Sequence, residues 1–170
     1  MSGLPDLNML VVSYNTITGL HLSGLENLEI LHADNNLLTT EQIYNCPVLN
    51  YLQLNNNNLT GINVDGVDNL TALYISHNQL TGLSLSGLSK LTYLDAEYNK
   101  LTSLSLSGVP NLIRLNLWRN NFTYFELSGL EKLEYIDLGS NLLTGISLSN
   151  LPAFKRIYIN GNQLTDLDIS

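Results

Sequence analysis

A pattern of 21 residues recurs along this chain without insertion or deletion, and it constrains the fold more than any other feature. One copy is the segment 67–87, VDNLTALYISHNQLTGLSLSG. A fixed period of this length predicts a solenoid in which one supersecondary unit stacks on the next. The copies fill nearly all of the 170 residues, so we expect a single repeat domain over residues 1–170 without conventional caps. Its eight repeats start at Leu4, Leu25, Cys46, Val67, Leu88, Val109, Leu130 and Leu151.

Each copy contains a short alternation of apolar and polar residues around its seventh and ninth positions, such as Leu73 and Ile75. This alternation is typical of a half-buried strand. Stacked copies should therefore form a curved parallel sheet on a concave side, and their inward side chains should build one continuous core. A second alternation, Leu83-Ser84-Leu85, follows without any helical period. We therefore expect short strands or turns, and little helix, on the opposite, convex side.

An Asn occupies the twelfth position of every copy. Its side-chain amide offers two donors and an acceptor, which can satisfy backbone groups left unpaired where the strand turns. Replacing a middle member such as Asn99 with Leu should cost on the order of 1–3 kcal/mol. The members of this predicted ladder are Asn15, Asn36, Asn57, Asn78, Asn99, Asn120, Asn141 and Asn162.

A Gly or an Asn closes each of the first seven copies. Both residue types tolerate a positive φ, so this corner is expected to need a left-handed backbone. The closing residues are Gly24, Asn45, Gly66, Gly87, Gly108, Gly129 and Asn150.

The repeat pattern L-x-x-L-x-x-L-x-L-x-x-N-x-L-T-x-L-x-L-S-G resembles that of leucine-rich-repeat proteins. Its short unit, with LT and LxLSG after the Asn, looks most like the bacterial surface repeats of internalin-related proteins. The resemblance implies a curved scaffold that binds protein through its concave sheet, and it favours a secreted or cell-surface bacterial location. We find no segment like the helical N-terminal cap, the immunoglobulin-like domain or the cysteine ladder of such proteins. Residues 1–10 do not resemble a signal peptide.

Charge and hydropathy exclude several classes of partner. The formal net charge is −8 and the pI is about 4.6. Nucleic acids and anionic membranes attract basic proteins, so no nucleic-acid partner is expected. The sequence contains no apolar run long enough to cross a bilayer, so we expect no membrane insertion.

Catalysis and metal binding find little support in the sequence. Cys46 stands at an apolar position and is interpreted as a small buried hydrophobe. His32 and Asp34 share a strand, but two strong ligands are too few for a metal. Carboxylates on an open sheet lack the enclosed environment that shifts catalytic pKa values. We therefore predict a protein that is not an enzyme and that needs no cofactor or metal.

The variable positions of each copy indicate where function should lie. The sixth, eighth, tenth and eleventh positions point outward on the concave side, and they hold seven of the nine Tyr and the only Trp. Tyr, Trp and Arg anchor protein interfaces, so this face is predicted to bind a protein ligand. The predicted binding residues are Tyr51, Tyr74, Tyr93, Asp95, Glu97, Arg114, Trp118, Arg119, Tyr135, Arg156 and Tyr158.

All seven Lys and Arg lie between Lys90 and Arg156. Tyr and Arg alternate at the sixth position of the later copies, which predicts cation–π contacts along the sheet. Asp95, Glu97 and Asp137 are close enough in this arrangement to pair with those arginines. Such a network could face a partner, or it could satisfy itself.

Two other functions remain open from the sequence. The exposed terminal repeats could pair with another copy, because an open strand edge is a template for association. The protein would then be a self-assembling structural module and a homo-oligomer. Alternatively, the Tyr, Trp, Asn and Asp side chains of the concave face could bind carbohydrate, as in an adhesin.

Overall fold

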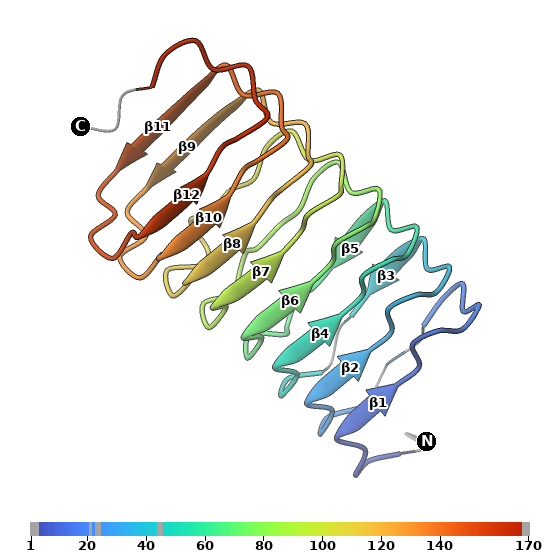
Figure 1. Ribbon diagram of the computed structural model, residues 1–170. Coiled ribbons are helices and arrows are strands. Elements are labelled where there is room, and N and C mark those ends of the chain that lie inside the picture. The colour runs from blue at the N-terminus through green and yellow to red at the C-terminus, as the bar shows by residue number, and fades with distance from the viewer. Residues whose placement is uncertain (1–3, 21, 23–24, 44–45, 168–170) are drawn as a thin grey trace.

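The computed structural model describes residues 4–20, 22, 25–43 and 46–167 of the chain. Its main element is a sheet of eight parallel strands, one from each repeat, which lie side by side in Figure 1. The strands are β1 (Met9–Val11), β2 (Ile30–His32), β4 (Tyr51–Gln53), β6 (Ala72–Tyr74), β7 (Tyr93–Asp95), β8 (Arg114–Asn116), β10 (Tyr135–Asp137) and β12 (Arg156–Tyr158).

The register of this sheet follows the repeat. Met9 lies opposite Ile30, and Tyr135 lies opposite Arg156, so each residue faces the one 21 positions later. Residues of one repeat position therefore form a continuous row across the sheet. The predicted leucine-rich-repeat solenoid, with one parallel strand per copy, is confirmed.

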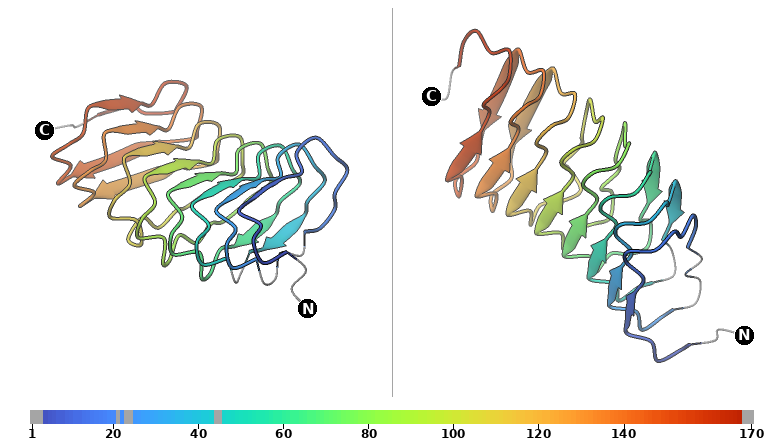
Figure 2. Two further views of the ribbon diagram at one scale, coloured as in Figure 1. Left: turned by 90° about the horizontal axis from the view of Figure 1, so that it is seen from below. Right: turned by 45° about the vertical axis from the view of Figure 1, so that its right-hand side comes forward.

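The other side of the solenoid carries four short strands in two parallel pairs (Figure 2). Strand β3 (Thr40–Gln42) pairs with β5 (Gly61–Asn63), and β9 (Tyr124–Ser128) pairs with β11 (Gly145–Ser149). Among the described residues there is no helix. The prediction of short strands or turns on the convex side is therefore confirmed.

A single apolar core runs along the inside of the solenoid. The central residue is fully buried in β2, β4, β6, β7, β8 and β10, Leu73 among them, and half-buried in the terminal strands β1 and β12. The residues on either side of it are half-exposed or exposed. Cys46 lies inside this core, with its sulfur 3.7 Å from the carbonyl oxygen of Leu22. Burial raises the pKa of its thiol, which disfavours the nucleophilic thiolate.

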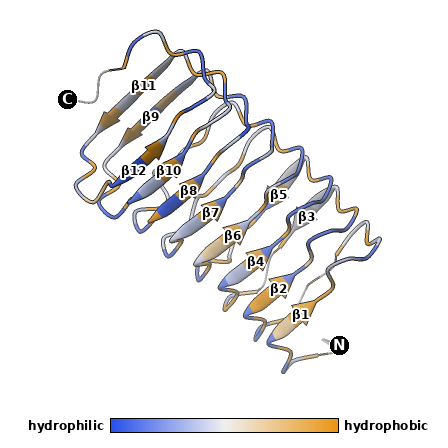
Figure 3. Ribbon diagram, in the orientation of Figure 1, coloured by the Kyte–Doolittle hydropathy of each residue, from blue (hydrophilic) through white to orange (hydrophobic). Residues whose placement is uncertain are grey.

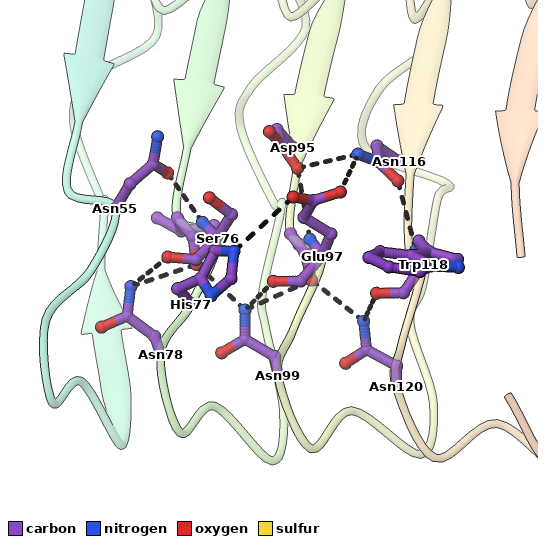
Figure 4. A network of polar contacts seen from close by, with 12 residues as sticks. Asn55, Ser76, His77, Asn78, Asp95, Glu97, Asn99, Asn116, Trp118 and Asn120 are labelled. Carbon is purple, nitrogen blue, oxygen red and sulfur yellow. Dashed lines mark hydrogen bonds and ion pairs between the residues drawn. The ribbon is translucent and has the colours of Figure 1, made fainter. Parts of the chain in front are cut away.

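The Asn side chains form a buried ladder beside the sheet (Figure 4). The Asn78 amide nitrogen donates to the carbonyl oxygens of Leu54, Ile75 and Ser76 at 3.0, 3.1 and 3.1 Å. Its oxygen accepts a hydrogen bond from the backbone nitrogen of Leu59 at 2.9 Å. Each Asn thus links its own turn to the preceding repeat. The same four-bond pattern recurs at Asn36, Asn57, Asn99, Asn120 and Asn141.

A left-handed residue precedes every Asn of the ladder. The eleventh position has φ between 50° and 58° in the first seven repeats, including Tyr98 and Arg119, and Gly161 has φ 69° in the eighth. This conformation costs a residue with a Cβ about 1–2 kcal/mol. We infer that the hydrogen bonds of the following Asn offset that cost, because they hold the two preceding carbonyl groups in the turn.

The residue that closes each repeat was expected to have a positive φ, and only some of the described closing residues have one. Gly108 does not have one, and the expectation is wrong there. It needs Gly for another reason, since an added Cβ would lie 2.6 Å from the carbonyl oxygen of Leu85. Gly24 and Asn45 lie outside the described residues. The positive φ is present at Gly66, Gly87, Gly129 and Asn150.

Candidate binding face

The concave face is the solvent-facing side of the eight-stranded sheet together with the two residues at the tenth and eleventh positions of each repeat. The predicted binding residues all lie on this face. Its strands carry Tyr51, Tyr74, Tyr93, Asp95, Arg114, Tyr135, Arg156 and Tyr158, and the residues just after the strands include Glu97, Trp118 and Arg119. Hydropathy changes along this face. Strands β1 and β2 are mostly apolar, whereas β8 and β12 carry hydrophilic residues (Figure 3).

A row of aromatic rings in contact crosses four neighbouring strands of this face. Ring centroids are 5.1 Å apart from His32 to Tyr51, 5.1 Å from Tyr51 to Tyr74, and 4.9 Å from Tyr74 to Tyr93. The rings alternate between the eighth and sixth positions, so each fills the space beside the next. Burial raises the pKa of Tyr51 and Tyr93 from the ordinary value of 10 to about 12, which shows that the rings shield both hydroxyls from water.

A second aromatic group lies just beyond the strand ends. His77 stacks on Tyr98 at 4.1 Å, and Tyr98 meets Trp118 edge-to-face at 4.9 Å. The guanidinium carbon of Arg119 lies 4.9 Å from the Tyr98 ring centre and 4.8 Å from that of Trp118. Among the described residues, Arg119 makes both of the cation–π contacts, one with Tyr98 and one with Trp118. The predicted stacking of the sixth-position arginines is therefore wrong.

His77 and Tyr98 belong to this second group but were not among the predicted binding residues, and neither was Gly139 beside it. Tyr98 occupies the variable eleventh position of its repeat, and this position was the sequence signal that could have identified it as a binding residue. Gly139 has no side chain, so the sequence does not mark it as part of a binding face. An added Cβ at Gly139 would lie 2.9 Å from Cδ1 of Trp118. We infer that Gly139 provides the room for the indole to lie beside the neighbouring repeat.

Asp95 and Glu97 form a polar network with Asn116 (Figure 4). The Asn116 amide donates to Asp95 at 3.2 Å and to Glu97 at 2.9 Å, and the Glu97 backbone nitrogen donates to Asp95 at 3.2 Å. His77 Nε2 lies 3.8 Å from the Glu97 carboxylate. The ion pairs of the described residues are this one and Lys155–Glu134, so the expected pairing with arginines is wrong.

Burial raises the pKa of the Asp95 carboxyl from 3.8 to about 6, and the charge of Glu97 adds to this effect. The folded state therefore holds a proton between pH 4 and 6 that the unfolded chain has lost. Stability linked to Asp95 is fully present below pH 4 and falls as pH rises through 6. The shift corresponds to about 3 kcal/mol, which partial solvent contact reduces to about 1 kcal/mol.

Asp95→Asn should therefore raise the free energy of unfolding at pH 7 by about 1 kcal/mol relative to the native chain. At pH 4 the two proteins should differ little, because the native carboxyl is then protonated in the folded state. Urea denaturation at the two pH values measures both differences. A stabilisation of equal size at pH 4 and pH 7 would show that the Asp95 charge is not its cause.

The last strands carry a third group. Tyr135 and Tyr158 have ring centroids 5.5 Å apart, and the Tyr135 hydroxyl donates to Asp137 at 3.4 Å. Asp137 also accepts the backbone N–H of Gly139 at 2.8 Å. Nine of the eleven predicted binding residues thus take part in contacts on one face, either in the three aromatic groups or in the Asp95–Glu97 network.

Metal chemistry and membrane insertion gain no support from the geometry. Asp34 accepts hydrogen bonds from Ser13 and Asn35, and its neighbour His32 stacks on Tyr51. Within the described ranges, no three His, Cys, Asp or Glu side chains are placed to hold a metal ion. The same residues include no helix that could span a membrane.

Comparison with known proteins supports the fold independently. A leucine-rich-repeat family model matches residues 47–101, and a second matches residues 132–154. No curated protein sequence matches the chain. A solved leucine-rich-repeat protein from Leptospira interrogans is similar, with a TM-score of 0.87 and 27% identity over 97% of this chain and 46% of that protein.

Two further structures share the fold. The leucine-rich-repeat domain of APL1B has a TM-score of 0.76 and 17% identity, over 96% of this chain and 60% of that one. The functional domain of InlJ from Listeria monocytogenes, which includes a cysteine ladder, has a TM-score of 0.54 and 22% identity over 98% and 61%. The chain spans about half to three fifths of the length of these structures. The chain is a leucine-rich-repeat solenoid whose short repeats are similar to those of the bacterial proteins among these structures.

Proposed function

We propose that this chain is a protein-binding module that holds its partner on the concave face. The observation that carries the proposal is the continuous row of rings from His32 to Tyr93, with spacings of 4.9 to 5.1 Å. Tyr and Trp are enriched among the few residues that supply most of the binding energy at protein interfaces. With strands about 4.8 Å apart, the row spans roughly 14 Å, which suits a peptide or loop crossing the strands.

The order already present in the rings supports binding in a second way. A side chain that is fixed before binding loses less conformational entropy when a partner covers it. The half-buried Tyr51, Tyr74 and Tyr93 hold one another, and Trp118 is held by Tyr98 and Arg119. The concave face thus presents anchor residues that need little rearrangement.

Carbohydrate binding is less well supported. Sugars stack on the open face of an aromatic ring, and in the Tyr row those faces are turned toward neighbouring rings, with interplanar angles between 28° and 37°.

Self-assembly is the other alternative. It has one observation in its favour, the exposed apolar side chains Met9 and Val11 on β1. Light scattering over a dilution series tests it, because a constant monomeric mass would exclude assembly through the terminal repeats.

Trp118→Ala and Tyr93→Ala should each weaken ligand binding by at least about thirtyfold, the loss typical of an interface anchor. Ligands are first selected from a phage-displayed peptide library on the immobilised chain, and their affinities are then measured by biolayer interferometry. Tyr124→Ala is the matched control, since this Tyr is 55% exposed on β9 of the convex side. Circular dichroism checks that all three variants fold.

Two outcomes would contradict the proposal. Unchanged affinity in both concave variants would move the binding site to another surface. A loss with Tyr124→Ala as large as those of the concave variants would place the ligand on the convex side.

A further inference from the structure

A hollow of about 420 Å³ opens at the later end of the concave face, between β7 and β12. It borders the Tyr row, with which it shares Tyr93, and lies where the chain concentrates its positive charge. Its lining includes Tyr93, Arg114, Glu134, Tyr135, Lys155 and Arg156.

The cations of this hollow exceed its acids. Lys155 is paired with Glu134 at 2.7 Å, and the hydrogen bond from Lys155 lowers the pKa of the Glu134 carboxyl. In the described part of the chain, neither Arg114 nor Arg156 takes part in an ion pair. Three positive groups therefore face one negative group, on a protein whose formal net charge is −8. This local excess of positive charge is complementary to an anionic ligand.

The two arginines are well placed to hold carboxylates. Both occupy the sixth position of their repeats, with Tyr135 directly between them in the register. They are therefore about 10 Å apart at the backbone, two strand spacings. A guanidinium binds a carboxylate through two parallel hydrogen bonds. The rings of Tyr93 and Tyr135 add apolar walls, which suit aromatic or aliphatic residues beside the acidic ones.

The surroundings of the hollow limit the length of the anionic segment. Asp95 and Asp137 lie on the same face, each two residues after a lining Tyr in its own strand. A long polyanion such as a sulfated glycan would meet these carboxylates and the acidic first half of the chain. A short acidic stretch between neutral residues would avoid them.

We infer that this hollow is the subsite for a short acidic peptide segment of the protein partner, with Arg114 and Arg156 binding its carboxylates. The inference rests on the proposed function, because it names the chemistry of the ligand for one part of the same face.

An NMR titration of the full chain tests the subsite. The probe is an eight-residue peptide with two Glu between aromatic residues, and its twin carries Gln in place of both Glu. We expect the Glu peptide to shift the guanidinium signals of Arg114 and Arg156 and to saturate. The Gln twin should bind at least about tenfold more weakly, because it loses the charge-assisted hydrogen bonds.

The double variant R114Q/R156Q should lose at least about tenfold in affinity for the Glu peptide. The double variant K90Q/K132Q is the matched control with the same net charge. Lys90 and Lys132 donate to Asn69 and Asn111 at the third repeat position, away from the concave face. Their loss should change affinity by less than about twofold, the effect of general charge alone.

Several results would overturn the inference. Equal binding of the Gln twin would show that the subsite does not recognise carboxylates. Binding of inorganic phosphate or of a heparin oligosaccharide as tight as that of the Glu peptide would assign the hollow to a small anion or a sulfated glycan. Display-selected ligands that depend on Trp118 but not on the two arginines would refute the subsite and leave the proposed function standing. Ligands that depend on none of Trp118, Tyr93 and the two arginines would refute both.

Discussion

Replacing Asn99 with Leu should lower the free energy of unfolding by about 3 kcal/mol. The side chain is only 8% exposed, and it makes four hydrogen bonds. Its nitrogen donates to the carbonyls of Ile75, Ala96 and Glu97 at 2.9, 3.2 and 3.2 Å, and its oxygen accepts from the Leu80 backbone nitrogen at 2.9 Å.

The size of this loss depends on what the substitution leaves behind. The three carbonyls keep other donors, from the Asn78 and Asn120 side chains and from the His77 backbone nitrogen. The buried Leu80 N–H loses its acceptor, and an unsatisfied buried donor costs about 1–3 kcal/mol. The weakened carbonyl interactions add to this. The turn before Asn99 also loses support, because Tyr98 has a left-handed conformation there, with φ 50°, which the Asn99 hydrogen bonds help to hold.

Asn15→Leu is the matched control at the start of the array. Asn15 is exposed, and among the described residues its side chain donates only within its own turn, to the carbonyl oxygens of Val12 at 3.0 Å and Ser13 at 3.1 Å. Its replacement should cost less than about 1 kcal/mol. Urea denaturation followed by circular dichroism measures both variants. Equal losses at the two positions would show that the buried links between repeats are not the source of the stability.

The repeat period was enough to predict the sheet and its rows. In a solenoid with one strand per copy, a period of 21 residues without insertions fixes the register, as the pair Met9 and Ile30 shows. The left-handed turn at the eleventh position was missed. Only four of its eight residues are the Asn, His or Gly that favour a positive φ, so residue preference marks it weakly. The following Asn supplies the hydrogen bonds that hold it.

The same rows place side chains on one face without determining which of them touch. Asp95 was expected to pair with an arginine, but its partners are Asn116 and the Glu97 backbone. Arg119 was not expected to provide the cation–π contacts, yet it lies over Trp118. Long side chains reach several neighbours from one backbone position, so local packing decides among them. That packing includes the space left by Gly139, which a pattern of side chains does not show.

Phe122→Ala should lower the free energy of unfolding by about 4 kcal/mol, within the range for a buried Phe that leaves a cavity. Phe122 is fully buried and meets the ring of Phe125 edge-to-face at a centroid distance of 5.2 Å. Phe122→Leu is the matched control, because Leu101 and Leu143 fill the same position in the flanking repeats. Its cost should be about 1–1.5 kcal/mol, since most of the volume remains filled.

Phe122 lies in the sixth repeat, so the loss of stability in Phe122→Ala should affect the later strands more than the earlier ones. Repeat arrays draw their stability from nearest-neighbour contacts, so a cavity here weakens the link between β10–β12 and the earlier strands. Amide hydrogen exchange in Phe122→Ala should therefore speed up more in β10 and β12 than in β4 and β6. Phe122→Leu should keep the native ratio of exchange rates. A uniform acceleration across all eight strands of the main sheet would mean that the solenoid unfolds as one unit, and that its stability is not divided among neighbouring repeats.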